Sequence, residues 1–259
     1  MTRKLRTADY EATLNLTVTL REALPPNHLA RFVADVIAQL DLASLYARYA
    51  PVGGEAIAPE ILLGLLFYGY ATGVFSSRIM KNSRNDGFDQ HYNVQVATDQ
   101  DSLLIVAAAL SNHANDQQEV EPTLDALPAQ LGSPEAAALD HGYFSSANVA
   151  ALEQRGIEAY IAPGREAHHP SWRAFFGELP PPPAPDASLK VKMAYKLQTE
   201  VGQAIYRLRQ CTVEPVIGVI KEVLGFRQFS LRGLAAAAGE WCLVCLAFNL
   251  KRLHRLMAG

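Results

Sequence analysis

A short apolar run that ends in a carboxylate and turns at once toward a helix is the feature that most constrains the fold. Residues 136–139 are apolar and are typical of a buried strand, Asp140 follows directly, and Gly142 supplies a turn. Ser145 or Ser146 can cap the helix that comes next. The segment is therefore one strand–turn–helix unit of an α/β layer, with a carboxylate at the end of the strand, where such layers place their chemistry.

The rest of the chain alternates between helical and strand patterns. Apolar residues recur at helical spacing over residues 28–49 and again over residues 59–70. Residues 92–98 alternate between apolar and polar, and the apolar run 103–110 follows a polar turn, which predicts a hairpin. Further helices and strands are expected at residues 116–127, 136–140, 147–156 and 158–162. This order predicts a sheet with crossover helices.

A proline-rich stretch separates this part from the C-terminal region. Residues 180–185 contain five prolines in six positions and predict a stiff linker or an exposed loop. Beyond it the pattern is helical at about residues 189–223 and 239–256. Within the first of these helices, Glu214 directly precedes Pro215, which favours a helix start at that point over a helix that runs through.

Composition limits the class of protein. The chain has 259 residues, 49% of them hydrophobic, which suffices for one large domain or two small ones. No stretch reaches the roughly 18 consecutive apolar residues of a membrane span, and the N-terminus lacks the apolar core of a signal peptide. Three cysteines do not make a disulfide framework. We expect a cytoplasmic protein without a membrane partner.

Charge is divided unevenly along the chain. Residues 1–170 hold 11 Lys and Arg against 20 Asp and Glu, whereas residues 171–259 hold 12 against 6. The net charges are −9 and +6. Such asymmetry suits a C-terminal part that binds a polyanion, and it is also common among solvated surfaces.

A second group of polar residues lies in the predicted C-terminal helix. Glu214 and Lys221 are seven residues apart and share a face if the helix survives Pro215. With Tyr206 and Arg209 nearby, Glu214 could be a metal ligand among cations that hold phosphates. A solvated charged helix explains the same pattern.

Several motifs, in order along almost the whole chain, resemble the DDE transposases of bacterial insertion sequences. The resemblance is carried by the sequence around Asp140, by Tyr206 and Arg209 with the segment 212–221, and by three further segments, 69–78, 87–99 and 239–251. It implies an α/β fold with an RNase H-like mixed sheet and flanking helices at residues 79–259, preceded by an all-helical region at residues 1–78.

The resemblance also implies a reaction and its partners. Members of this family transpose DNA with three carboxylates and two divalent ions, Mg²⁺ or Mn²⁺, held about 3.5–4 Å apart. The DNA partners are the terminal inverted repeats and the target, at the bacterial nucleoid, and copies of the chain are expected to associate on DNA. By position, Asp140 is the second carboxylate and a metal ligand, Glu214 is the third, and Tyr206, Arg209 and Lys221 surround the DNA phosphates. One residue more separates Arg209 from Glu214 than in some branches.

The sequence departs from the family where the first carboxylate is expected. Ser76, Ser77 and Arg78 run straight into Ile79-Met80-Lys81, so that two family motifs overlap. An internal deletion would produce this junction and would remove the first catalytic strand with its aspartate. The remaining candidates for the first carboxylate are Asp99 and Asp116, although each is more simply a turn or helix-cap residue.

Two functional hypotheses follow. One is an active transposase that cleaves and transfers DNA strands with Asp140, Glu214 and either Asp99 or Asp116. The other is a truncated and inactive remnant that at most binds DNA or a full-length transposase.

Overall fold

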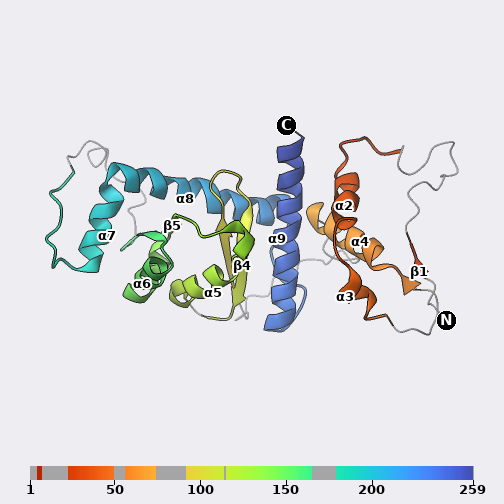
Figure 1. The fold of residues 1–259 in the computed structure, drawn as a ribbon, viewed down its shortest axis with the longest axis horizontal. Helices are drawn as coiled ribbons and strands as arrows, with labels where there is room; N and C mark the ends of the chain where they lie inside the picture. The colour runs from red at the N-terminus through yellow and green to blue at the C-terminus, as the bar shows by residue number, and fades with distance from the viewer. Residues whose placement is uncertain are drawn as a thin grey trace, which may run out of the picture. The chain divides into compact units, whose positions relative to one another are not determined.

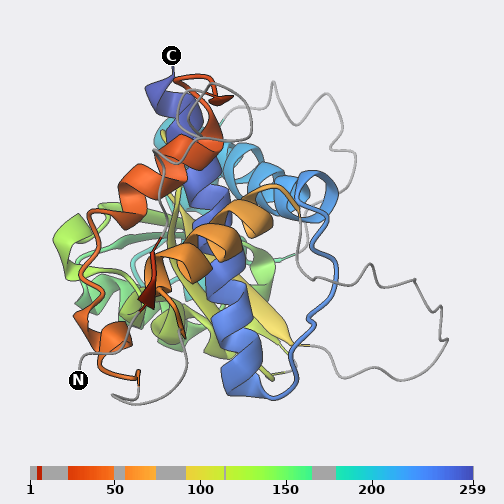
Figure 2. The same cartoon turned by 90° about the vertical axis from the view of Figure 1, so that its right-hand side faces the viewer.

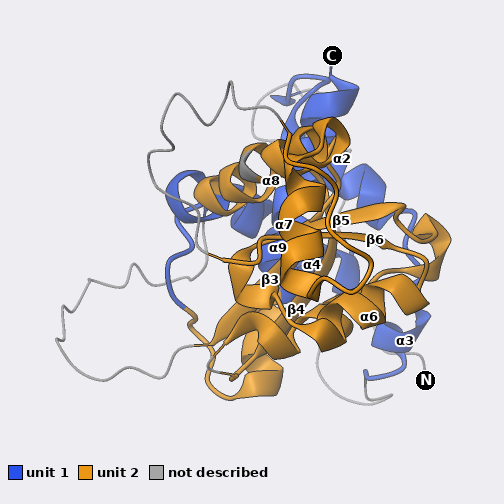
Figure 3. Ribbon diagram, turned by 90° about the vertical axis from the view of Figure 1, so that its left-hand side faces the viewer, with its two compact units in different colours: residues 1–83, 220–228, 242–259 blue, residues 84–219, 229–241 orange. Residues whose placement is uncertain are grey.

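The computed structural model describes residues 5–7, 23–49, 56–73, 92–113, 115–164 and 179–258. The chain divides into two compact units, shown in separate colours in Figure 3. Unit 1 comprises residues 1–83, 220–228 and 242–259, and unit 2 comprises residues 84–219 and 229–241. The last residues of the chain therefore belong to the same unit as the first ones.

Unit 1 is built around two helices, α2 (Leu29–Ile37) and α4 (Pro59–Ala71). They lie side by side, as Figure 1 and Figure 2 show, because Val33 and Ile37 of α2 form a buried cluster with Phe67 of α4. The side chain of His28 accepts a hydrogen bond from the N–H of Ala30 and so caps α2. The smaller elements are α3 (Ala43–Tyr46) and the paired strands β1 (Leu5–Arg6) and β2 (Ala56–Ile57).

Unit 2 contains two short ladders among its described residues. Strands β3 (Asn93–Thr98) and β4 (Ile105–Ser111) form the predicted antiparallel hairpin. Strands β5 (Ala136–Leu139) and β6 (Glu158–Ile161) pair in parallel, with α6 (Ser146–Gln154) as the crossover between them. The described part is thus a mixed α/β fold, with separate two-stranded ladders in place of one continuous mixed sheet.

The helices of unit 2 cover these ladders. Helix α8 (Glu200–Gly218) lies over β5 (Figure 1) and also contacts β6 and β3, and helix α7 (Leu189–Gln198) contacts β6. A second cluster of buried side chains joins α6 to β6 through Leu152, Ile157 and Ile161. The short elements are η1 (Asp116–Gln118), α5 (Val120–Asp125), η2 (Ala129–Leu131) and η3 (His141–Tyr143).

Two expectations about the C-terminal region have different outcomes. The proline-rich stretch 180–185 forms no helix or strand, as predicted. The expectation of a helix start at Glu214 is wrong, because α8 runs through Pro215 to Gly218 and continues as the π-helical turn η5 (Val219–Val223). Pro215 is exposed, and Thr212 and Val216 on either side of it are buried. Packing of this face therefore keeps α8 continuous, although Pro215 has no N–H with which to donate a helical hydrogen bond.

Helix α9 (Leu234–Met257) is the longest in the described part of the chain. By length and composition alone it could cross a membrane, and no other described helix passes that test. However, 44% of its most apolar stretch is buried inside the protein, and core helices pass the same test.

A buried carboxylate fixes the loop that leads into α9. The side chain of Glu240 is 1% exposed, and its oxygens accept hydrogen bonds from the backbone N–H groups of Ser230, at 2.9 Å and 3.1 Å, and of Leu231, at 3.0 Å. A buried carboxylate that accepts several N–H bonds is compensated for its lost hydration. The loop and the helix therefore stabilise each other.

We expect Glu240→Ala to lower the free energy of unfolding by about 2–3 kcal/mol, because the backbone N–H groups of Ser230 and Leu231 lose the buried carboxylate that accepts from both. Glu240→Gln keeps one acceptor oxygen and should cost about half as much. Urea unfolding followed by circular dichroism measures both. The control is Glu222→Ala, which removes an exposed ion pair with Arg227 at 2.6 Å and should cost under about 1 kcal/mol. Equal losses in Glu240→Ala and the control would contradict the structural role of Glu240.

Candidate functional site

Asp140 lies at the carboxyl end of β5, where the sequence predicts it. Its Oδ1 accepts a hydrogen bond from the N–H of His141 at 2.6 Å and lies 3.2 Å from the Nδ1 of the same residue. The Nη1 of Arg209, on α8, is 3.8 Å from the Oδ2 of Asp140. The Asp140 side chain is 51% exposed, so that it is accessible from solvent while in contact with two basic residues.

The surroundings of Asp140 favour its charged form. Partial burial raises the pKa of its carboxyl group, but the hydrogen bonds from His141 and the charge of Arg209 together outweigh this, and the pKa falls below its usual value. The carboxylate is therefore ionised at neutral pH and already has a cationic neighbour.

A polar network ties the turn after Asp140 to strand β3. The Oδ1 of Asp116 accepts hydrogen bonds from Asn93 at 2.9 Å and from Gln95 at 3.0 Å. The hydroxyl of Tyr143, in η3, donates to the side-chain carbonyl of Gln95. Burial, and then the charge of Asp116, raise the pKa of Tyr143, so its hydroxyl keeps the proton that it donates.

Asp116 lies beside the turn that carries Asp140. A Cβ atom placed on Gly142 would be 3.2 Å from the Oδ2 of Asp116, so only glycine leaves ample room there. Because Gly142 is two residues after Asp140, the two aspartates belong to the same end of the unit. Of the two candidates for the first carboxylate, Asp116 is the one placed near Asp140.

Asp99 lies at the other end of the hairpin. Its carboxylate accepts hydrogen bonds from the N–H of Ser102 at 2.8 Å and from the hydroxyl of Ser102 at 2.5 Å, and these bonds lower the pKa of Asp99. Asp99 follows Asn93 by six residues of extended chain, which is about 20 Å along the strand. Since Asn93 contacts Asp116, Asp99 lies far from the turn that carries Asp140 and serves the hairpin turn.

Glu214 lies on the exposed side of α8. Residues in an α-helix are rotated by about 100° each, so Glu214 points about 140° away from Arg209. The nearby residues Thr212 and Val216 are buried and lie on the opposite side of the helix. Helix α8 therefore presents Arg209 to Asp140 and presents Glu214 to solvent.

The three residues expected around DNA phosphates have different environments. Tyr206 is 9% exposed and packs in a cluster with Tyr160 of β6 and with Ala162, just beyond that strand. The guanidinium of Arg209 lies over the Tyr206 ring at 5.1 Å, and its side chain is 15% exposed. Lys221 lies in η5, in unit 1, and is exposed. Of the three, Lys221 is the residue that a phosphate can approach freely.

A further buried carboxylate is engaged near this site. Glu119 is 1% exposed, and its Oε1 lies 2.5 Å from the hydroxyl of Ser111 and 2.7 Å from the Nδ1 of His113. These contacts join β4 to the start of α5. Sequence patterns predict neither the contacts of Glu119 nor the network of Asn93, Gln95 and Tyr143. The one sequence signal for that network is that Asn93 and Gln95 lie on the same face of the predicted strand.

Comparison with protein families identifies the chain. A transposase DDE domain family matches residues 184–254, and a transposase domain of the DUF772 family matches residues 18–101. The chain belongs to the DDE transposases of insertion sequences. The first match includes Arg209, Glu214 and Lys221, and neither match includes Asp140. No curated protein and no solved structure matches this transposase.

Transposases of this family generally use divalent metal ions, which need several converging ligands. In the described part of the chain, no three His, Cys, Asp or Glu side chains converge as metal ligands. Asp140 is paired with Arg209, Asp116 is bonded to two amides, and Glu214 faces solvent. These residues do not fit a complete two-ion site in this arrangement.

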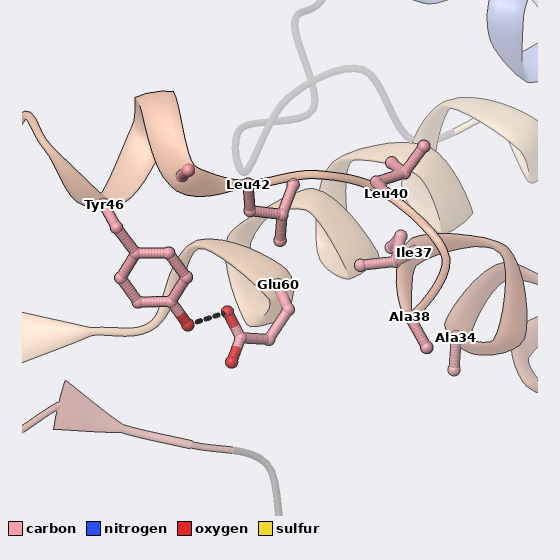
Figure 4. A pocket seen from close by; sticks show the side chains of 8 residues that line it. Ala34, Ile37, Ala38, Leu40, Leu42, Tyr46 and Glu60 are labelled. Atoms are coloured by element: carbon pink, nitrogen blue, oxygen red, sulfur yellow. Dashed lines mark hydrogen bonds between the residues drawn. The ribbon is translucent and has the colours of Figure 1, made fainter.

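Unit 1 of the transposase has a pocket of its own. It is an open cavity of about 390 Å³ between α2, α3 and α4, lined mainly by apolar side chains, with the hydroxyl of Tyr46 donating to the carboxylate of Glu60 at 2.6 Å (Figure 4). This hydrogen bond raises the pKa of Tyr46. Glu60 is the sole acidic residue of the lining, so the pocket has no set of catalytic groups.

We expect Tyr143→Phe to destabilise the transposase by about 1–2 kcal/mol, because the buried Gln95 amide loses its donor. The free energy of unfolding in urea measures this. Tyr195→Phe, on α7, is the control, because the described residues give its hydroxyl no hydrogen bond, and it should change stability by less than about 0.5 kcal/mol. A Tyr143→Phe protein as stable as the parent would mean that the network does not hold the turn.

Proposed function

We propose that this chain is a transposase that binds DNA, including the terminal repeats of its element, but does not cleave it. The observation that carries the proposal is the separation of its carboxylates. Asp140 is held against Arg209, whereas Glu214 lies on the solvent side of the same helix. An RNase H-like site needs these groups to converge, together with a third.

The strand pairing supports the same proposal. In the described residues, β5 pairs with β6 only, and β3 pairs with β4 only, although α8 contacts β3, β5 and β6. The four residues of β5 are all apolar and only half-buried. This is what an RNase H-like sheet would look like if the strand beside Asp140 had been lost by the deletion inferred at residues 76–81.

A basic surface of unit 1 supports DNA binding. The final segment, residues 242–259, holds Lys251, Arg252 and Arg255 and no acidic residue. The ring of His254 packs at a tilt of 54° against Phe32 of α2, with 5.5 Å between centroids, and its Nε2 lies 2.8 Å from the carbonyl oxygen of Asn27. Helices α2 and α4 hold one cation between them, Arg31, and the C-terminal end of α9 adds further cations to this unit.

The cations of this surface repel one another. Burial, and then the charge of Arg255, lower the pKa of Lys251. Like charges four residues apart destabilise a helix, and a bound phosphate would relieve the repulsion. This arrangement favours an anionic partner, and DNA is the partner of the family.

Cleavage is tested with a duplex that carries an end of the element, in Mg²⁺ or Mn²⁺, by following nicked product on a denaturing gel. We expect no nicking by the parent chain and none by Asp140→Ala, with the duplex bound in both cases. Nicking by the parent that disappears in Asp140→Ala would overturn the proposal.

An active transposase that uses Asp116 as its first carboxylate is the second candidate. It is favoured by one observation, the position of the Asp116 carboxylate beside Gly142. In that case nicking by the parent would be lost in Asp116→Asn as well as in Asp140→Ala, and would be retained in Asp99→Asn.

We expect the double substitution Lys251→Gln with Arg255→Gln to weaken DNA binding for all sequences alike. The slope of log K against log salt should become shallower by about 0.9 for each DNA phosphate that the protein no longer neutralises. Fluorescence anisotropy between low and moderate salt measures this. The matched control, Lys251→Arg with Arg255→Lys, keeps both charges and should keep the slope. An unchanged slope in the Gln variant would place the DNA elsewhere.

A further inference from the structure

The side chain that α8 brings to Asp140 is a cation. Arg209 Nη1 lies 3.8 Å from the Oδ2 of Asp140, and Glu214, one and a half turns further along, faces away. A positive charge at this distance opposes the binding of a divalent cation to the same carboxylate. Arg209 therefore serves either to bind a DNA phosphate or to pair with Asp140.

The packing of Arg209 favours Asp140. Its side chain is 15% exposed, its guanidinium lies over the buried Tyr206 ring at 5.1 Å, and its Nε is buried with no hydrogen-bond partner among the described residues. The guanidinium thus lies over the ring, and its Nη1 is the atom that lies near the carboxylate. An anion nearby offsets the lost hydration of a partly buried cation, and the ion pair formed by Arg209 in the described structure is with Asp140.

The same geometry disfavours a phosphate at Arg209. A phosphate close enough to bond Arg209 would also approach the ionised Asp140, which is 51% exposed and repels it. A divalent ion at Asp140 would in turn meet the charge of Arg209. The pair therefore disfavours both kinds of ligand.

We propose that Arg209 is the resident counter-ion of Asp140, which excludes divalent metal from this carboxylate and does not contact DNA. The inference rests on the proposed function in that it explains why Asp140 is not used for cleavage. It goes beyond that function because it assigns Arg209 a role that differs from phosphate binding.

The test is Mn²⁺ binding to the full chain, followed by the electron paramagnetic resonance signal of free Mn²⁺. The parent should bind no ion at Asp140, so that Asp140→Asn and Glu214→Gln leave the titration unchanged. Arg209→Gln removes the competing charge and should bind Mn²⁺ at least about tenfold more tightly than the parent. The double variant Arg209→Gln with Asp140→Asn should lose this gain, and Arg209→Lys, which keeps the charge, should titrate like the parent.

DNA affinity supplies an independent measurement on the same proteins. Arg209→Gln should bind DNA within about twofold of the parent, with an unchanged salt slope. Parent protein that binds Mn²⁺ and loses it in Asp140→Asn would overturn the inference, and this comparison does not depend on the folding of Arg209→Gln. A lower DNA affinity of folded Arg209→Gln, with a shallower salt slope, would also overturn it.

The outcomes separate this inference from the proposed function. Mn²⁺ binding at Asp140 without any nicking would end the inference and leave a DNA-binding, non-cleaving transposase. Nicking by the parent would end the proposed function, whatever Mn²⁺ titration shows.

Discussion

The rotation of α8 about its own axis is the constraint on which the candidate site depends. Tyr206, Thr212 and Val216 are buried along one side of this helix, and Tyr206 packs with residues of β5 and β6. Burial of an aromatic ring and its neighbours is worth several kcal/mol, far more than an exposed charge pair. The buried face of α8 therefore determines which of the polar side chains of this helix reach Asp140.

Local patterns predicted most of the elements. The hairpin β3–β4, the unit β5–α6–β6, the helix α4 and the proline-rich loop all follow from the periodicity or the turn residues of their own segments. Helix α8 continues through Pro215 because its packing outweighs the hydrogen bond that proline cannot donate. That packing involves β5 and β6, which lie more than 40 residues earlier in the sequence.

The site was less predictable than the helices and strands, because it depends on packing between segments that are distant in the sequence. Asp140 was found because its position depends on its own strand and turn. Asn93 and Gln95 look like the solvated face of a half-buried strand, and only the fold brings them to Asp116 and Tyr143. Spacing could show that Glu214 and Lys221 share a helix face, but it could not show which face meets the sheet.

The extra residue between Arg209 and Glu214 connects these observations. A carboxylate at position 213, four residues after Arg209, would lie within about 40° of it and on the packed side of α8, whereas position 214 is a further 100° around. Turning α8 to bring Glu214 toward Asp140 would expose Tyr206, Thr212 and Val216 and would carry Arg209 away. In this fold the Asp140–Arg209 pair and a site that joins Asp140 to Glu214 are therefore alternatives, and the buried face of α8 stabilises the pair.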